Sequence, residues 1–151
     1  MTYSFWHIFN NPIFWPALTS YLLAQIAKIV LRFIETKYID LKLMTSTGGM
    51  PSSHAALVMS VCVTVGIHTG FDSIAFGIAA TVAAVIMYDA TGVRYESGKQ
   101  AKAINTIVEL MSDGDFETHF SELKELLGHR PVEVLVGAIL GIAVAVIASF
   151  F

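Results

Sequence analysis

One short polar segment, from Gly48 to His54, reads Gly-Gly-Met-Pro-Ser-Ser-His and leads directly into a long apolar run. Pro51 fits the first position of a helix, where its missing N–H would be unpaired anyway. The unpaired N–H groups of such a helix start, with the hydroxyls of Ser52 and Ser53, would bind phosphate at the positive end of the helix dipole. His54 would then lie beside the anion. The alternative is a capped helix with a histidine at the membrane interface.

A second group with similar residue types lies at the entrance to the last apolar stretch. It runs from Gly128 to Glu133 and again contains a glycine, a histidine and an early proline. His129 and Glu133 are four residues apart, so in a helical first turn the carboxylate can accept a proton from the imidazole. A histidine held in this way can be a nucleophile or a general base. The alternative is an interfacial histidine with a capping glutamate.

Further charged residues lie at or inside the apolar stretches. Asp89 and Arg94 follow the third of them, and Lys99 comes soon after. Lys28 and Arg32 lie one turn apart in the first. Intramembrane cations face the interior of a helix bundle or extend to the interface. We expect Lys28 to point toward the site and Arg32 to extend to the interface.

The apolar stretches that position these groups have the composition of a membrane protein. The chain has 151 residues, 55% hydrophobic and 14% charged, with a mean hydropathy of +0.66. A membrane crossing needs about 20 apolar residues, and three stretches supply them: Ile13 to about Ile34, Ala55 to Tyr88, and Val132 to Phe151. The middle one is too long for one crossing and breaks at His68–Asp72. The sequence predicts a single-domain (1–151), all-α, polytopic transmembrane helical bundle of about four spans.

Two other segments are expected at the membrane interface. Apolar side chains recur at helical spacing in the largest non-spanning region, which predicts an amphipathic interfacial helix. Its apolar positions are Ala101, Ile104, Val108 and Met111. The aromatic residues near the start of the chain are typical of an interfacial belt. These are Phe5, Trp6, Phe9, Phe14 and Trp15.

The nine Lys and Arg residues indicate the orientation in the membrane. They fall in the first loop, in the region after the third span, or in the half of span one that leads into the first loop: Lys28, Arg32, Lys37, Lys42, Arg94, Lys99, Lys102, Lys124 and Arg130. With four spans both loops lie on one side, and the positive-inside rule makes that side cytoplasmic in a bacterial plasma membrane, with both termini outside. Binding of an anionic substrate would be another reason for Lys and Arg residues to lie on that side. Three span ends with two histidines and two carboxylates then meet on one face, which favours a site over three separate caps.

Several segments, spread in order along the chain, together resemble a known family. They are Ala24-Gln25-x-x-Lys28, Gly48-Gly49-Met50-Pro51-Ser52-Ser53-His54, Asp89-Ala90-x-Gly92-Val93-Arg94, Gly98-x-Gln100-Ala101 and Gly128-His129-x-Pro131-x-Glu133. The chain resembles the superfamily of type 2 phosphatidic acid phosphatases and vanadium haloperoxidases, and more closely its small divergent membrane branch.

This resemblance implies metal-independent hydrolysis of a phosphate ester in two steps through a phosphohistidine. It makes His129 the nucleophile, Glu133 the carboxylate that orients it, and His54 the acid that protonates the leaving oxygen. Preorganised donors would stabilise the phosphate charge most strongly in the transition state. The expected substrate-binding residues are Lys28, Ser52, Ser53, Asp89, Arg94, Lys99, Lys124 and Arg130.

The chain also departs from the superfamily pattern in its cationic residues. No Lys is followed seven positions later by Arg-Pro, and the position six residues before His129 is Leu123 instead of Arg. Two hypotheses follow. The first is a lipid phosphate phosphatase acting on a phosphomonoester or pyrophosphate lipid such as phosphatidylglycerophosphate or phosphatidate. The alternative is a non-catalytic module that binds or transports an anion or lipid phosphate.

The expected partners follow from the same reading. They are the lipid phosphate substrate and membrane lipids, with no nucleic acid. No spaced Asp cluster offers hard-cation ligands, so no metal and no cofactor are expected. A homodimer is compatible with so small a bundle.

Overall fold

The structure is a computed structural model that describes residues 5–38, 49–92, 98, 100–107 and 130–151. Its elements are the 3-10 helix η1 (Phe5–Asn10) and the α-helices α1 (Phe14–Thr36), α2 (Ser53–Thr69), α3 (Ile74–Thr91) and α5 (Pro131–Ala148). None of the described residues forms a strand. The predicted all-α class is confirmed, and the helices follow the predicted apolar stretches closely.

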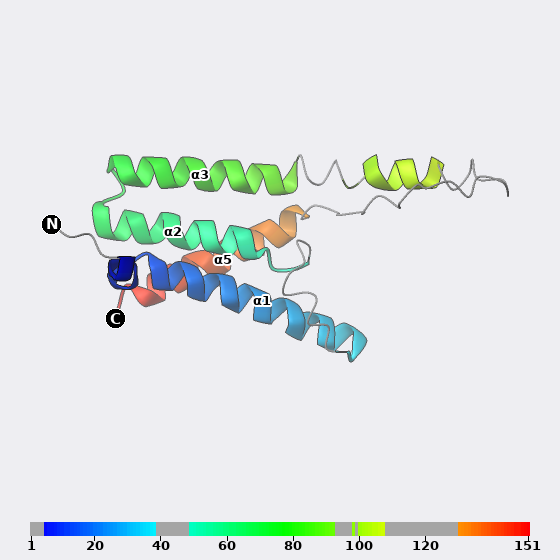
Figure 1. Cartoon of the computed structure of the whole chain (residues 1–151), viewed down its shortest axis with the longest axis horizontal. Coiled ribbons are helices and arrows are strands. Elements are labelled where there is room, and N and C mark those ends of the chain that lie inside the picture. Colours follow the sequence, from blue (N-terminus) through cyan, green and yellow to red (C-terminus); the bar gives the residue numbers. More distant parts are fainter. Residues whose placement is uncertain (1–4, 39–48, 93–97, 99, 108–129) are drawn as a thin grey trace.

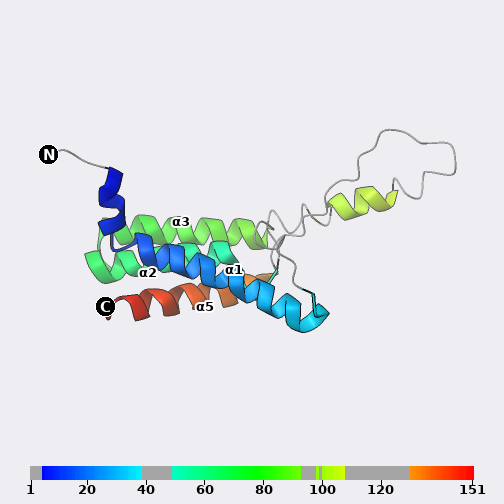
Figure 2. The same ribbon diagram turned by 60° about the horizontal axis from the view of Figure 1, so that its bottom comes forward.

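Helix α2 lies at the centre of the bundle and packs against α1, α3 and α5. Helices α1 and α5 also contact each other, whereas α3 lies on the other side of α2 (Figures 1 and 2). Helix η1 and the end of α5 lie at the same end of the bundle (Figure 1). The up-and-down order of the four helices therefore brings the end of α1, the start of α2, the end of α3 and the start of α5 to the opposite end.

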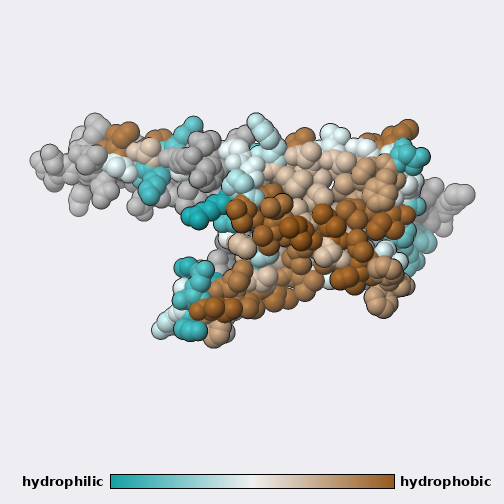
Figure 3. Space-filling model, turned by 180° about the vertical axis from the view of Figure 1, so that it is seen from behind, coloured by the Kyte–Doolittle hydropathy of each residue, from teal (hydrophilic) through white to brown (hydrophobic). Residues whose placement is uncertain are grey.

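The bundle has the surface of a membrane-spanning protein. Helices α1, α3 and α5 are long and apolar enough to cross a membrane, and α2 is apolar but has 17 residues. Figure 3 shows apolar side chains covering the bundle, with hydrophilic residues gathered at its ends. In α3 only Ala83 and Ala90 are buried. An apolar outer surface of this kind is stable only in lipid, so the chain is an integral membrane protein.

Close backbone packing joins α2 to α5. A Cβ atom built on Gly141 would overlap the carbonyl oxygen of Ala56, and one on Gly137 would overlap the carbonyl oxygen of Ser52. The Ser20 hydroxyl of α1 donates to the same Ala56 carbonyl oxygen at 3.3 Å. Small residues four apart allow helices to approach closely in a membrane, where apolar burial alone gives no drive to associate. Three helices thus meet around one carbonyl group.

The turn between α2 and α3 ends one span and starts the next. Gly70 has a positive φ of 93° and its N–H donates to the Gly66 carbonyl oxygen, which ends α2. The Ser73 hydroxyl accepts from the Phe76 N–H at 3.1 Å and caps α3. The Phe71 ring packs edge-on against the Phe76 ring. The predicted break in the long middle stretch is confirmed.

The aromatic residues of the N-terminal region form one cluster. Phe9 contacts the rings of Trp6, Phe14 and Trp15, and the Trp15 indole N–H donates to the Phe9 carbonyl oxygen at 2.9 Å. Trp6 and Trp15 are more than half exposed. A cluster of exposed tryptophans at a bundle end is typical of the membrane interface.

The predicted amphipathic helix is described in part. Residues 100–107 are helical and lie beyond the end of α3, away from the bundle (Figure 1). Val108 and Met111 lie outside the described residues. The expected location of this helix at the membrane interface stays a prediction.

Candidate functional site at the helix ends

Three helix ends meet in a small buried cluster. Ala55 at the start of α2, Ala90 at the end of α3 and Val134 at the start of α5 are buried against one another, with Met87 packed on them. The expected convergence of three span ends is therefore confirmed for the described residues. The start of α2, the end of α3 and the start of α5 therefore lie together at one end of the bundle.

The start of α2 differs from the expectation in one respect. Ser52, with extended backbone, is the N-cap, and its hydroxyl accepts from the Ala55 N–H at 3.4 Å. The helix begins at Ser53, so the prediction that Pro51 occupies the first helical position is wrong. Serine is favoured at the N-cap because its hydroxyl accepts a hydrogen bond from a helix N–H that has no partner within the helix. Proline has no side-chain acceptor for this bond.

The backbone just before α2 is hydrogen-bonded to α5. The Ser52 N–H donates to the Glu133 carbonyl oxygen at 2.9 Å, beside the point where Gly137 lets α5 approach. This amide is therefore not available to a ligand, contrary to the expectation that the amides near Ser52 are all free. The bond instead sets the distance between the first turns of α2 and α5.

Lys28 is the last buried residue of α1, and its side chain is only 3% exposed. Its ammonium nitrogen donates to the Ser53 hydroxyl at 3.3 Å, and the backbone of Gly49 lies beside its stem. Within the described part of the chain, no carboxylate lies within ion-pair distance of Lys28. An ammonium has three N–H donors, so this one can still bind an anion.

Glu133 closes the first turn of α5. One of its carboxylate oxygens accepts from the Arg130 N–H at 3.3 Å, and its own N–H donates to the Arg130 carbonyl oxygen at 2.9 Å. Pro131 occupies the first helical position. The capping role that the sequence allowed for Glu133 is present, and it engages one of the two carboxylate oxygens. Its role in orienting His129 stays a prediction.

The remaining site candidates divide by location. His54 is exposed on the first turn of α2, Asp89 is half-buried near the end of α3, and Arg130 is exposed at the start of α5. These three lie at the same end of the bundle as Lys28, Ser52 and Ser53. The candidates outside the described residues are Arg94, Lys99, Lys124 and His129.

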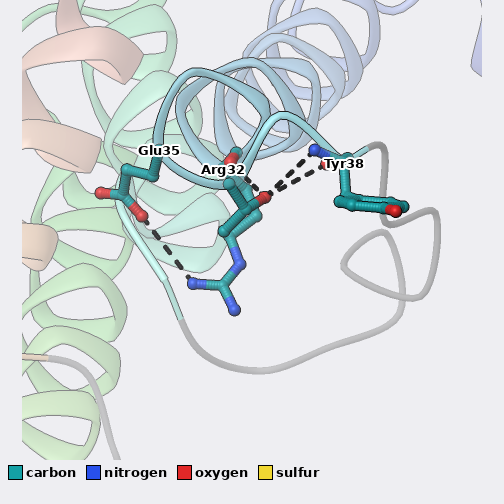
Figure 4. Close-up of polar contacts among 4 residues, drawn as sticks. Arg32, Glu35 and Tyr38 are labelled. Atoms are coloured by element: carbon teal, nitrogen blue, oxygen red, sulfur yellow. Dashed lines mark hydrogen bonds and ion pairs between the residues drawn. The ribbon is translucent and has the colours of Figure 1, made fainter.

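Arg32 lies away from the buried site. Its guanidinium pairs with the Glu35 carboxylate at 3.8 Å, and both side chains are more than half exposed (Figure 4). Only one of the two cations of α1, Lys28, is therefore turned into the bundle, as the sequence predicted.

Sequence reasoning missed the residues that support the site. Gly137 and Gly141 set the approach of α5 to α2, and Ser20 joins α1 to the same point. Gln25, which the sequence did single out together with Lys28, is buried one turn before Lys28 and donates to the Tyr21 hydroxyl at 2.9 Å. The signal that could have found the glycines is their spacing of four in an apolar span.

Comparisons with known proteins agree with this architecture. The model of the family described as the Divergent PAP2 family matches residues 9–144, which include all the site candidates. YuiD of Bacillus subtilis, described as an uncharacterized membrane protein, is 38% identical over 150 residues, covering 89% of this chain and 92% of that protein. No solved structure matches the chain.

Proposed function

Since this chain belongs to the Divergent PAP2 family, we propose that it is a membrane lipid phosphate phosphatase. In this proposal it hydrolyses a phosphomonoester or pyrophosphate lipid through a phosphohistidine intermediate, without a metal. The observation that carries the proposal is the buried ammonium of Lys28 beside the Ser53 hydroxyl.

A buried cation such as Lys28, which has no ion-pair partner among the described residues, is costly in a membrane protein and is typical of a functional site. Lys28 lies against the first turn of α2, where the hydroxyl of Ser53 is equally buried. A phosphate oxygen placed between them would pair the ammonium and accept from the hydroxyl. The helix start adds the positive end of its dipole. These are the groups that bind a phosphate dianion.

The proposed chemistry has two steps. In the first, a nitrogen of His129 attacks phosphorus and the bond to the lipid oxygen breaks, while His54 donates a proton to that oxygen. In the second, water attacks the phosphohistidine, His54 takes a proton from the water, and inorganic phosphate leaves. Glu133 lies in the first helical turn, where its carboxylate can orient the His129 ring. Lys28 stabilises the charge on the phosphoryl oxygens in both steps.

The proposed substrate side follows from charge. In the sequence, all nine Lys and Arg residues fall in the half of α1 that leads to the site end or in the two segments that connect α1 to α2 and α3 to α5. The positive-inside rule then favours a cytoplasmic location for that end. We infer a lipid phosphate made on the cytoplasmic side, such as phosphatidylglycerophosphate or phosphatidate. In this orientation, both chain ends would lie outside, because the order of the four helices brings them to the end opposite the site.

The proposed contact between the Lys28 ammonium and the phosphate predicts unequal roles for the two cations of α1. Lys28→Met keeps the length of the stem in an apolar environment but removes the charge, so we expect kcat/KM for phosphate release from phosphatidylglycerophosphate micelles to fall about 100-fold. Arg32→Met is the matched control on the same helix. It should change kcat/KM less than twofold, because Arg32 is exposed and pairs with Glu35.

Equal losses of kcat/KM in these two variants would contradict the proposed anion site at Lys28.

The same assay separates the two functional hypotheses. Phosphate release that resists a chelator and is inhibited by vanadate supports the phosphatase. Binding of lipid phosphate that is weakened by Lys28→Met, with no release from any lipid phosphate offered, would indicate the binding or transport module instead.

The orientation can be measured with single cysteines. In a Cys62→Ala background, Lys37→Cys places a thiol at the site end and Asp72→Cys places one in the turn at the other end, where both native side chains are exposed. A membrane-impermeant thiol reagent added to intact cells should label position 72 and not position 37. Labelling of position 37 alone would overturn the cytoplasmic orientation.

A further inference from the structure

A groove of about 390 Å³ lies between α1 and α2, and no described residue of α3 or α5 lines it. Its walls are Phe14, Ala17 and Leu18 of α1 and Leu57 and Val61 of α2. The described residues of α1 and α3 make no contact with each other, so the groove opens toward the membrane between these two helices. It therefore presents a hydrocarbon surface that a lipid can reach from the side.

The outer end of the groove is formed by the chain that leads into α1. Ile8 of η1 lies there, with Asn11 and Ile13 after it. Asn11 has the one polar side chain of the lining, and its side-chain oxygen accepts from the Ile13 N–H at 2.9 Å. The groove is therefore lined by hydrocarbon from η1 to Leu57.

The α1 wall continues along one helix face to the proposed phosphate site. Phe14, Ala17, Tyr21 and Lys28 are spaced by three, four and seven residues, so they share one face of α1. Tyr21 is half-buried, and its hydroxyl accepts from the Gln25 amide at 2.9 Å. A phenol can donate its own proton while it accepts in this way. This face thus presents hydrocarbon, a hydroxyl donor and an ammonium in that order.

The α2 wall leads to the same place. His54, Leu57 and Val61 are spaced by three and four residues, so they also share one helix face. Val61 lies about 10 Å along the helix from His54. The bond from the Ser20 hydroxyl to the Ala56 carbonyl oxygen joins the two helices between the groove and the site. Both walls of the groove therefore run from hydrocarbon to the groups that would bind the phosphate and protonate the leaving oxygen.

We propose that this groove holds one acyl chain of the lipid phosphate substrate, and that the Tyr21 hydroxyl donates a hydrogen bond to the ester carbonyl oxygen of that chain. An ester-linked glycerolipid phosphate carries its phosphate, ester and hydrocarbon in the same order as Lys28, Tyr21 and the groove. A polyprenyl phosphate has no ester oxygen for Tyr21. The inference rests on the proposed phosphate site at Lys28, and it names the substrate class of that site.

The headgroup supplies most of the affinity in this arrangement. A chain that moves from the bilayer into an apolar groove gains little free energy, because the surrounding lipid tails are equally apolar. The charged contact with Lys28 holds the lipid, while the groove and Tyr21 set its position. Occupancy of the groove should therefore depend on the phosphate.

Photo-crosslinking in phosphatidylcholine vesicles tests the proposal. The probe is phosphatidate with a diazirine in the middle of one acyl chain, and the protein carries His129→Ala so that the probe is not hydrolysed. We expect label around Phe14 and Leu57 to exceed label around Val82, which is exposed on α3. Added dioleoyl phosphatidate should displace the label from the groove, and added dioleoyl phosphatidylcholine should not. Lys28→Met should lower the groove label about tenfold.

Competition between ester and ether lipids tests the contact with Tyr21. Dioleoyl phosphatidate should displace the probe about fivefold better than its dialkyl ether analogue, which lacks the carbonyl oxygen. Tyr21→Phe keeps the ring and removes the donor, so it should abolish this difference. A merely structural role for Tyr21 would weaken both competitors alike, and that result would overturn the ester contact.

A filled groove gives an independent test. Ala17→Trp places a large ring in the groove and should lower the label there to the level on α3. Ala84→Trp, on the exposed face of α3, is the matched control and should leave the groove label unchanged.

Groove label that is indifferent to added phosphatidate and to Ala17→Trp would show annular lipid only and overturn the proposal. The crosslinking does not measure phosphate release. Phosphatidate bound in the groove of a protein without turnover would therefore contradict the proposed phosphatase and still support the groove.

Discussion

Replacing either proposed catalytic histidine by alanine is expected to lower kcat for lipid phosphate hydrolysis by about 10³-fold or more. His129→Ala removes the atom that forms the phosphoenzyme, so neither step of the proposed reaction can proceed. His54→Ala leaves the nucleophile but removes the proton for the leaving oxygen. His7→Ala is the control, because His7 is exposed in η1 at the opposite end of the bundle. It should retain full activity.

The two histidine variants should also differ from each other. Rapid quenching with radiolabelled substrate should trap a phosphoenzyme in the unaltered protein that is labile in acid and stable in base, as a phosphorus–nitrogen bond is. The His129→Ala variant should give none at any time. In the His54→Ala variant the phosphoenzyme should form slowly, and a substrate with a better leaving group should restore its formation, because such a group needs no proton.

Retention of phosphoenzyme in His129→Ala would assign the nucleophile to another residue and contradict the proposed mechanism. If a chelator abolished the activity of the unaltered protein, the reaction would require a metal cation, which also contradicts the proposed mechanism. Each result is independent of the anion contact made by Lys28. A protein could therefore fail the histidine test and still show the Lys28 effect.

The helical layout could be predicted from the sequence because it depends on local properties. A run of about 20 apolar residues predicts a span whatever its neighbours, and Gly70 interrupts a run that is too long for one crossing. Once four spans are assigned, topology alone brings the starts of α2 and α5 and the end of α3 together. The burial of Ala55, Ala90 and Val134 confirms that reasoning.

The details of the site could not be predicted because they depend on contacts between helices. Pro51 and Ser52 are both reasonable residues at a helix start, and only the hydroxyl contact with Ala55 decides the cap. The Ser52 amide looked available to a ligand, but its partner is the Glu133 carbonyl oxygen, 81 positions further along.

The contact between Gly141 and Ala56 predicts a large loss of stability for a single added methyl group. Gly141→Ala places a Cβ atom on the carbonyl oxygen of Ala56, and neither backbone can move without separating α2 from α5. Alanine favours the helix over glycine by about 1 kcal/mol, but overpacking of this kind costs about 1–3 kcal/mol or more. We expect the apparent melting temperature in detergent to fall by roughly 5 °C, measured by circular dichroism.

Gly77→Ala is the matched control, because Gly77 lies on the exposed face of α3 and an added Cβ would meet no atom within 4 Å. The Gly77→Ala variant gains the same helix propensity without placing a Cβ atom on another backbone. Its melting temperature should therefore stay unchanged or rise. Equal effects of the two substitutions would mean that α2 and α5 are not in close contact. The separation caused by Gly141→Ala should also weaken the bond between Ser52 and Glu133, which lie four residues before Ala56 and eight residues before Gly141. Phosphate release should therefore fall in Gly141→Ala below its melting temperature, and remain unchanged in Gly77→Ala.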